Sequence, residues 1–359
     1  MKKYYTMVTK SYVPDWSVTD GIREFIANAL DSEAPFEYSV TEGKVELTSI
    51  GINLGASCLT LGTSENRNNT EAVGQHGEGI LIGLVPILRE GGSVTFYNGS
   101  VIWEATFEHN SDFNREVLVI VETPTECHKD YTVSITTSNE NIKLALDNCL
   151  YTRGDLGNIL EGKRGRVFDG FSGKLYVGGL FVTNIQDPKF SYDFHPSCLP
   201  LNRDRKTIES WEINKNTAIL LSEVLSAKEV AQMVKDKSSS VSTIRFRDSV
   251  DNIRTECFNM FKEEYGEDAV AVEYYSNKRD LEDTGYKNVV VIGDDNYRDM
   301  IINSLEYKVN IEKIKEGLDY KEDSRSPIEL LGEWYINQSA EDFQVMLDLF
   351  NKKGVKWCE

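Results

Sequence analysis

The first clear pattern of hydrophobic and polar residues along the chain has a helical period. Glu24, Asn28 and Asp31 are spaced i, i+4 and i+7, so a helix carries all three on one polar face. The opposite face is apolar and consists of Ile22, Phe25, Ile26, Ala29 and Leu30. Thr19 or Asp20 is expected to cap the start of this helix. The pattern therefore predicts an amphipathic helix that carries a stripe of carboxylate and amide side chains.

Alternating apolar and polar residues predict several strands. Residues 36–40 and 44–48 alternate on either side of Glu42-Gly43, which is typical of a hairpin with one buried face. Further strands are predicted at residues 93–97, 101–107, 116–121 and 131–135, and Asn98-Gly99 predicts a tight turn between the first two. With a helix predicted at 139–150, these elements indicate an antiparallel sheet with helices on one side, an α+β architecture.

A glycine-rich stretch, Gly74-Gln75-His76-Gly77-Glu78-Gly79, directly precedes an apolar run at residues 80–88. Backbone amides at the start of a helix can surround a phosphate chain. Pro86 lies inside the run, so the helix is expected either to kink there or to be short. Together with the polar stripe, this stretch predicts one joint site. Asn28 is offered to a magnesium ion, Glu24 to a water molecule and the glycine turn to a triphosphate.

Both stretches resemble motifs of the GHKL ATPases, the superfamily of gyrase, heat-shock chaperone, histidine kinase and MutL, which fold as a Bergerat α/β sandwich. Glu24-x-x-x-Asn28-x-x-Asp31 resembles the N-box, and residues 74–79 resemble the second glycine box. The resemblance implies that Glu24 is the general base for the attacking water and that Asn28 is the magnesium ligand. Residues 62–73 correspond to the ATP lid. The implied phosphate contacts are Gly74, Gly77 and Gly79, and the wider nucleotide-binding set includes Asp31, Gln75, His76 and Glu78.

The first glycine box of the family differs in this chain. The family pattern, Asp-x-Gly-x-Gly, begins with an aspartate that accepts a hydrogen bond from the adenine amino group. Here Ser49 stands at that position, two residues before Gly51. A serine hydroxyl still accepts a hydrogen bond, but it lacks the charge that strengthens one. The difference bears on adenine selectivity more than on phosphate and magnesium binding. A late strand of the family approaches the adenine with a threonine, and Thr132 is the corresponding candidate.

Two later stretches resemble the middle domain of the ninety-kilodalton heat-shock chaperones. Residues 173–184 resemble the strand that opens that domain, and residues 199–206 resemble its Leu-Pro-Leu-Asn-x-Ser-Arg-Glu loop. In that loop the arginine contacts the γ-phosphate of ATP, which implies that Arg205 is a catalytic phosphate sensor. A guanidinium suits this role because it is a planar, permanently charged fork. Arg203 or Lys206 can act in the same way; the alternative is that the cluster is a surface salt-bridge network.

The pattern divides the chain into three parts. Residues 1–150 are predicted to form the ATP-binding domain, and residues 151–172, which are rich in glycine and basic side chains, a linker. Residues 173–359 are predicted to form a middle- or transducer-like α/β domain with an acidic helical C-terminal part. Within it, helices are expected at 208–235, 250–265 and 296–305, and short buried strands at 270–273 and 289–292.

Composition narrows the choice of functions. The 359 residues are 40% hydrophobic and 27% charged, as in an ordinary soluble globular protein. The formal net charge of -19 argues against a general nucleic-acid binder or a protein of anionic membranes, because phosphate groups demand a basic face. Six scattered cysteines without a C-x-x-C pair, no apolar N-terminal run and no segment of membrane-spanning length predict a cytoplasmic protein without disulfides.

The residues and the resemblance together predict a magnesium-dependent ATPase that hydrolyses ATP slowly and uses it as a conformational switch or clamp on a protein partner. Relatives suggest a homodimer formed through the first domain and a chaperone-like role, and the compact length and abbreviated family pattern suggest a phage or mobile-element protein. The alternative is a nucleotide-gated protein-binding module without hydrolysis, which Ser49 favours and Glu24 opposes. A histidine kinase needs a phospho-acceptor histidine on a dimerisation helix, and none of His76, His109, His128 and His195 sits in one.

Overall fold

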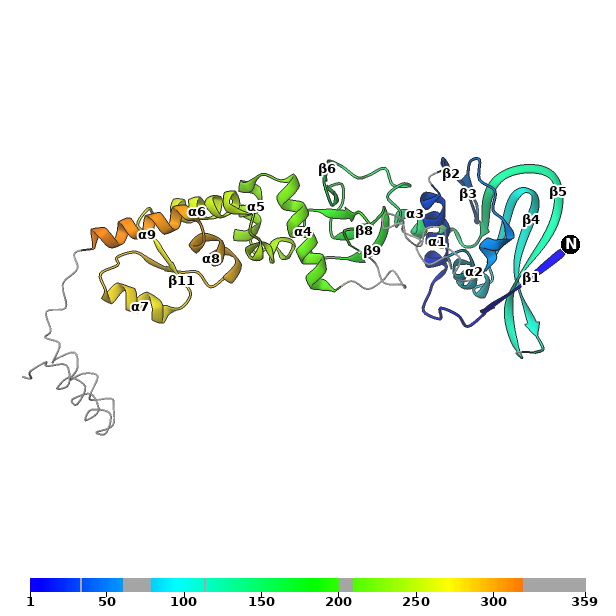
Figure 1. Ribbon diagram of the computed structural model, residues 1–359, viewed down its shortest axis with the longest axis horizontal. Helices are drawn as coiled ribbons and strands as arrows, with labels where there is room; N and C mark the ends of the chain where they lie inside the picture. The colour runs from blue at the N-terminus through cyan, green and yellow to red at the C-terminus, as the bar shows by residue number, and fades with distance from the viewer. Residues whose placement is uncertain (33, 61–78, 113, 200–208, 319–359) are drawn as a thin grey trace, which may run out of the picture.

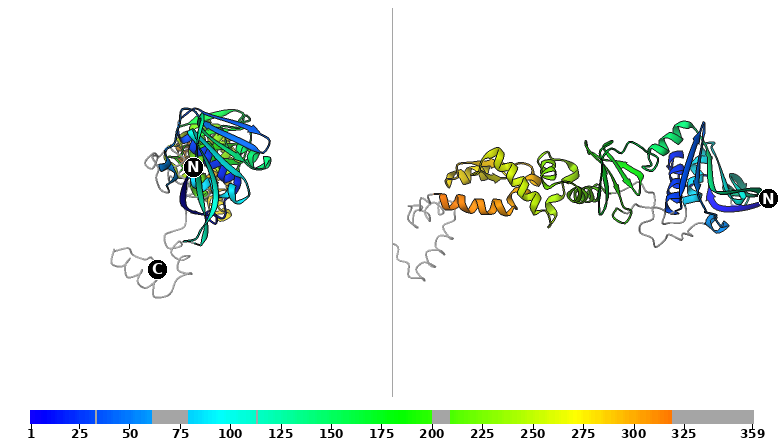
Figure 2. Two further views of the ribbon diagram at one scale, coloured as in Figure 1. Left: turned by 90° about the vertical axis from the view of Figure 1, so that its right-hand side faces the viewer. Right: turned by 90° about the horizontal axis from the view of Figure 1, so that it is seen from above.

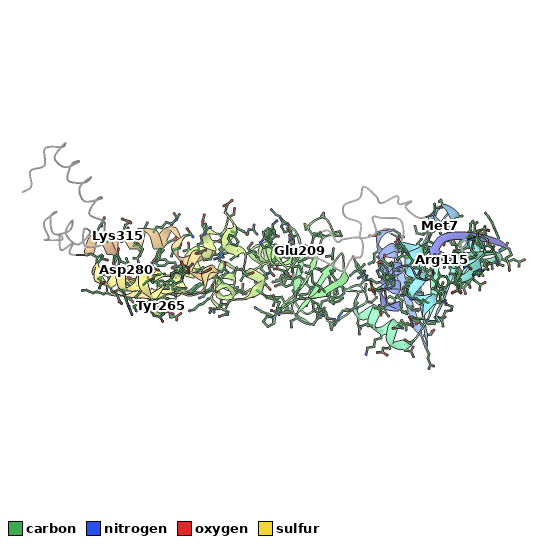
Figure 3. All side chains as sticks on the ribbon, turned by 90° about the horizontal axis from the view of Figure 1, so that it is seen from below. Met7, Arg115, Glu209, Tyr265, Asp280 and Lys315 are labelled. Atoms are coloured by element: carbon green, nitrogen blue, oxygen red, sulfur yellow. The ribbon has the colours of Figure 1, made fainter. Side chains whose placement is uncertain are left out.

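The computed structural model describes residues 1–32, 34–60, 79–112, 114–199 and 209–318. The described elements follow one another along a long axis, from the sheet that contains the N-terminal strand to helix α9 (Figure 1). Met7 and Arg115 lie near one end of this axis and Asp280 and Lys315 near the other (Figure 3). Among the described helices, none combines the length and the apolar character needed to cross a bilayer.

The first sheet is antiparallel and is built around one long strand. It contains β1 (Lys2–Thr9), β2 (Phe36–Thr41), β3 (Lys44–Ser49), β4 (Ser93–Asn110) and β5 (Arg115–Thr136). Along one edge of β5, the first part of the strand pairs with β1 and the last part pairs with β3. The other edge of β5 pairs with β4, and β2 pairs with β3. The hairpin predicted at Glu42-Gly43 is confirmed as the β2–β3 connection.

The turn predicted at Asn98-Gly99 is wrong, because β4 runs through both residues. The pairing register with β5 shifts on each side of Gly99, whose φ of +59° marks a bulge rather than a chain reversal. The buried Asn98 side chain accepts a hydrogen bond from the Leu54 N–H and donates one to its carbonyl, both at 2.8 Å. This contact spans 44 residues of sequence, so a local dipeptide pattern gives no sign of it.

Three helices cover one face of the first sheet: α1 (Val18–Asp31), α2 (Gly79–Arg89) and α3 (Asn139–Asp147). They share one apolar core with β3, β4 and β5, which confirms the predicted α+β sandwich.

The N-cap of α1 is Ser17, so the expectation of Thr19 or Asp20 is wrong. Ser17 and Asp20 form a capping box, in which the Asp20 N–H donates to the Ser17 hydroxyl and the Asp20 carboxylate accepts from the Ser17 N–H. A short 3-10 turn, η1 (Ala56–Leu59), follows β3.

Helices α1 and α2 touch through their backbones. A Cβ atom built on Gly21 would lie 2.5 Å from the Gly83 carbonyl oxygen, and one built on Gly83 would lie 3.0 Å from the Gly21 carbonyl oxygen. Pro86 is inside α2 and packs on the same spot, with its Cγ 3.1 Å from the Gly21 Cβ position. The two glycines therefore set the distance between the helices.

The last residue of α2 anchors the segment between β1 and α1. The Arg89 guanidinium donates to four backbone carbonyls, those of Tyr12, Val13, Pro14 and Trp16, with the shortest contact, 2.7 Å, to Trp16. The segment contains Val13 at a φ of +44°, a conformation that a β-branched residue rarely adopts. The Arg89 contacts help to hold this segment in place.

A second sheet follows, made of β6 (Ile159–Gly162), β7 (Gly165–Phe168), β8 (Lys174–Val177), β9 (Leu180–Asn184) and β10 (Ser191–Phe194) in the order β6-β7-β10-β8-β9. Its β6–β7 hairpin lies within the segment expected as a linker. The chain reverses between Gly162 and Gly165, so part of this segment belongs to the second sheet. Residues 173–184 form the β8–β9 hairpin rather than one strand. Gly178 and Gly179 both have positive φ at its turn, as a tight hairpin requires.

The remaining elements are mostly helical and share a core with the second sheet. They are α4 (Ser210–Val224), α5 (Ala227–Lys235), η2 (Ser239–Val241), η3 (Ile244–Phe246), α6 (Asp251–Tyr265), β11 (Val270–Val272), α7 (Tyr275–Asp283), β12 (Val289–Val291), α8 (Asp295–Ile302) and α9 (Leu305–Gly317). The single helix predicted at 208–235 is two, because a capping box at Ser226 and Glu229 starts α5. The predicted α/β alternation is confirmed, with β11 and β12 parallel.

Gly21→Ala is expected to lower the free energy of unfolding by about 1–3 kcal/mol, because the new methyl group meets a backbone carbonyl that cannot move aside. Urea denaturation measures the change. Gly317→Ala, at a helical glycine with open space around its Cβ position, is the matched control and should be neutral or stabilising. Equal stability of the two variants would contradict the packing argument.

Candidate active site

Helix α1 holds the two polar side chains that the sequence singles out. Glu24 is buried, with only 2% of its surface exposed, and Asn28 lies one turn further on and is half-buried. Both stay on the helix face that turns toward α2, since the apolar residues of α1 pack into the core below them. The Nδ2 atom of Asn28 is buried and has no hydrogen-bond partner among the described residues.

Gly79 brings the second stretch to the first. It is the first residue of α2, and a Cβ atom built on it would lie 3.1 Å from Asn28 Nδ2, 3.2 Å from Asn28 Oδ1 and 3.2 Å from Glu24 Oε2. Only a glycine leaves the two side-chain ends undisturbed here. Three residues from motifs about fifty positions apart thus meet at the N-terminus of one helix. Gly74, Gln75, His76, Gly77, Glu78 and the lid segment 62–73 lie outside the described residues.

The donor set at this place fits a magnesium ion that is bound mainly by its substrate. Magnesium usually takes one or two protein oxygens and completes its shell with phosphates and water. The Asn28 Oδ1 atom supplies one such oxygen, and the Nδ2 atom of the same amide has no hydrogen-bond partner within the described part of the chain. Among the described residues, no three His, Cys, Asp or Glu side chains gather into a metal cluster. The N-terminus of α2 adds backbone dipoles that favour a negative ligand.

Ser49 and Thr132 lie on opposite faces of the first sheet. Ser49 ends β3, is 3% exposed, and is paired with Tyr131, a residue of the core beneath the helices. Thr132 follows Tyr131 and precedes Val133, another residue of that core, so its side chain points to the other face. Its hydroxyl lies 3.0 Å from the Thr48 hydroxyl and donates to the Asp130 carbonyl. The structure therefore does not bring Thr132 to the face of Glu24.

Gly51 and Asp31 are two further residues of the predicted nucleotide-binding set that the structure describes. Gly51 has a φ of +78°, and its N–H donates to the Asp130 carboxylate at 3.0 Å. Asp31 is the half-buried last residue of α1. Burial raises the pKa of the Cys58 thiol, which packs against the core of the first sheet, to about 11, so this cysteine is a neutral packing group. Arg203, Arg205 and Lys206 lie outside the described residues.

A surface hollow of about 810 Å³ lies elsewhere, beside the N-terminus of α1. Its walls come from Ser17 and Val18, from the β2–β3 turn, from the residues after α2 and from the start of α3, including Ser138. Neither Glu24, Asn28 nor Gly79 lines it. The hollow is therefore separate from the place where the two motifs meet.

Arg23 is a residue of this site that the sequence pattern did not single out. It is 7% exposed, its Nη2 lies 3.7 Å from Glu24 Oε1, and its Nη1 donates to the Phe181 carbonyl of β9 at 3.3 Å. The available signal is its position four residues before Ala27 and seven before Leu30, which places it at the border of the apolar face of the helix. A charged residue is rarely buried there without a specific partner.

Comparisons with known proteins give two similarities. No family model matches the sequence. An uncharacterized protein of Mycoplasma pneumoniae is 22% identical over 242 residues, which cover 61% of this chain and 96% of that protein. The ATPase region of Saccharomyces cerevisiae topoisomerase II bound to ICRF-187 (dexrazoxane) aligns with a TM-score of 0.32 and 11% identity. That alignment covers 46% of this chain and 63% of the other, and a TM-score this low supports no conclusion about function.

Gly79→Ala is expected to change the free energy of unfolding by less than about 1 kcal/mol, because its methyl group meets the movable ends of Asn28 and Glu24 rather than backbone. The side-chain amide signal of Asn28 in a ¹H–¹⁵N spectrum should shift. The side-chain amide of Asn303, which donates to the Asp299 carbonyl in α8, serves as the internal control and should not move. An unshifted Asn28 signal would show that Gly79 is not in contact with it.

Proposed function

We propose that this chain binds Mg-ATP between α1 and the N-terminus of α2, hydrolyses it slowly, and uses nucleotide binding as a conformational switch. The observation that supports this most directly is the meeting of Glu24, Asn28 and Gly79, because it unites a buried carboxylate, a half-buried amide and a helix N-terminus. The resemblance of the two motifs to those of GHKL ATPases supports the same function independently of the geometry.

Each described residue has a chemical role in the proposed reaction. A water molecule attacks the γ-phosphorus, Glu24 accepts the proton that the water loses, and the bond to the bridging β–γ oxygen breaks, so that ADP and phosphate leave. Asn28 would hold a magnesium ion, which when bound neutralises charge on the phosphates. Burial of Glu24 keeps bulk water away from the reacting atoms.

The remaining parts of the proposal rest on the resemblance. Gly74, Gly77 and Gly79 would contact phosphates, and Arg205, with Arg203 or Lys206 as substitutes, would report the γ-phosphate from the second part of the chain. Residues 1–150 would form the nucleotide domain and residues 173–359 the part that moves. The resemblance also implies a protein partner on which the switch acts and a homodimer formed through the first part.

A second candidate function is a nucleotide-gated binding module without hydrolysis. Ser49 favours it, because the chain lacks the family aspartate that recognises adenine, and selective hydrolysis of ATP is then less strongly implied. The buried Glu24 favours the ATPase. Burying a carboxylate costs free energy, so a carboxylate without a role in a reaction is expected at the surface.

Glu24→Gln is expected to bind ATP as the wild type does and to lower the rate of phosphate release by at least about 100-fold, because glutamine cannot accept the proton. Phosphate release and calorimetric ATP binding on the same samples measure both quantities. Glu140→Gln, at an exposed position of α3, is the control and should leave both unchanged. Binding without turnover in the wild type would instead favour the binding module.

The wild type is expected to discriminate between ATP and GTP by less than about tenfold, because a hydroxyl both donates and accepts hydrogen bonds. Ser49→Asp should raise the preference for ATP by about tenfold, since a charged acceptor strengthens a bond from the adenine amino group and repels the guanine carbonyl. Competition binding measures the ratio. Ser49→Asn, which is neutral and of similar size, is the control, and an equal gain with asparagine would contradict the charge argument.

A further inference from the structure

The helix layer of the first sheet faces the second sheet, and the contact between them is made beside Glu24. Figures 1 and 2 both show α1 on the side of the first sheet that is turned toward β8 and β9. The Arg23 side chain crosses this junction. Its guanidinium donates to the Phe181 carbonyl at 3.3 Å and approaches the Glu24 carboxylate at 3.7 Å. One planar group thus touches both the second sheet and the candidate base.

The β8–β9 hairpin is fixed to the first part of the chain by backbone pairing. The Leu150 N–H donates to the Gly179 carbonyl at 2.8 Å, and the Phe181 N–H donates to the Asn148 carbonyl at 2.9 Å. Between these bonds Cys149 and Leu180 form a β-bridge. The Leu180 side chain is 2% exposed and belongs to the same apolar core as Ile22, Phe25 and Ile26 of α1.

The turn of this hairpin is held rigidly. The Gly179 N–H donates to the buried Asp193 carboxylate at 2.7 Å, and that carboxylate also accepts from Arg166 at 2.9 Å. A Cβ atom on Gly179 would lie 2.6 Å from the Tyr151 ring, so the turn and Tyr151 are in close contact. The Phe181 carbonyl is two residues away and is therefore a fixed acceptor. Its position changes only if the hairpin moves as a unit.

We propose that Arg23 is a positioning residue that makes the orientation of the Glu24 carboxylate depend on the docking of the β8–β9 hairpin. This inference rests on the proposed function and concerns the regulation of the same site. A guanidinium holds its donors in one plane, so the hydrogen bond at Nη1 fixes where Nη2 faces the carboxylate. The 3.7 Å separation from the carboxylate is that of an ion pair, and a displacement of about 1 Å at a reacting group can reduce a rate by as much as 100-fold.

Two variants separate this role from simple stabilisation. Arg23→Lys keeps the positive charge but has one ammonium group, which cannot hold the carbonyl and the carboxylate in one plane. Leu180→Ala loosens the hairpin in the core and leaves the side chains of α1 unchanged. Arg254→Lys is the matched control, because Arg254 also joins a carboxylate, that of Asp251, to a backbone carbonyl, that of Arg247, in the distant helix α6.

The experiment measures kcat and KM for ATP in the full chain, together with amide hydrogen exchange at Leu150 and Phe181 with and without a non-hydrolysable ATP analogue. Arg23→Lys and Leu180→Ala should each lower kcat by about tenfold or more with KM changed less than about twofold, and the double variant should fall no further than the stronger single one. The analogue should change exchange at both amides in the wild type but not in Arg23→Lys. Arg254→Lys should behave as the wild type.

The outcomes distinguish the inference from the function on which it rests. A wild type that turns over ATP while Arg23→Lys keeps its kcat, or additive losses in the double variant, would overturn the coupling role of Arg23 alone. A wild type that binds no ATP would overturn the proposed function and this inference with it. Wild-type exchange at Leu150 and Phe181 that ignores the analogue, with binding demonstrated, would also overturn the coupling.

Discussion

The contact between the backbones of α1 and α2 is the constraint on which the candidate site depends. Gly21 and Gly83 allow the helices to approach until carbonyl groups replace side chains at the interface. Only at that distance does the first residue of α2 reach the ends of Glu24 and Asn28. Larger residues would separate the helices and leave a carboxylate and an amide facing a gap. The site is therefore a product of close packing before it is a product of polar chemistry.

Much of the first part of the fold could be predicted from sequence because its signals are local. The polar stripe of α1, the β2–β3 hairpin and the helix after the glycine stretch all follow from spacing within a few residues. The continuous course of β4 could not be predicted, because Asn98 is held by Leu54, far away along the chain. The position of Thr132 was missed for a different reason. Its face depends on which neighbours enter the core, and the pairing of β3 with β5 decides that.

The candidate site was predictable to the extent that its residues belong to recognisable motifs. Glu24, Asn28 and Gly79 do, and the structure brings these three together. Arg23 belongs to none, and its significance appears only once Phe181, 158 residues later, is seen within hydrogen-bond distance. Long-range contacts of this kind join separate parts of a protein, so sequence spacing alone does not reveal them. The net charge of the whole chain is strongly negative, but it gives no information about one buried guanidinium, because that group interacts only with its immediate neighbours.

Helix α2 has a mechanical consequence that follows from what is fixed at its two ends. Its first residue touches Glu24 and Asn28, and its last residue, Arg89, holds four carbonyls of the segment that leads from β1 to α1. It spans about 16 Å, the length of an eleven-residue helix, and links these two sets of contacts directly. Gly83, where α2 contacts α1, lies between these two ends. A shift of the segment after the N-terminal strand would therefore be passed through α2 to the candidate site.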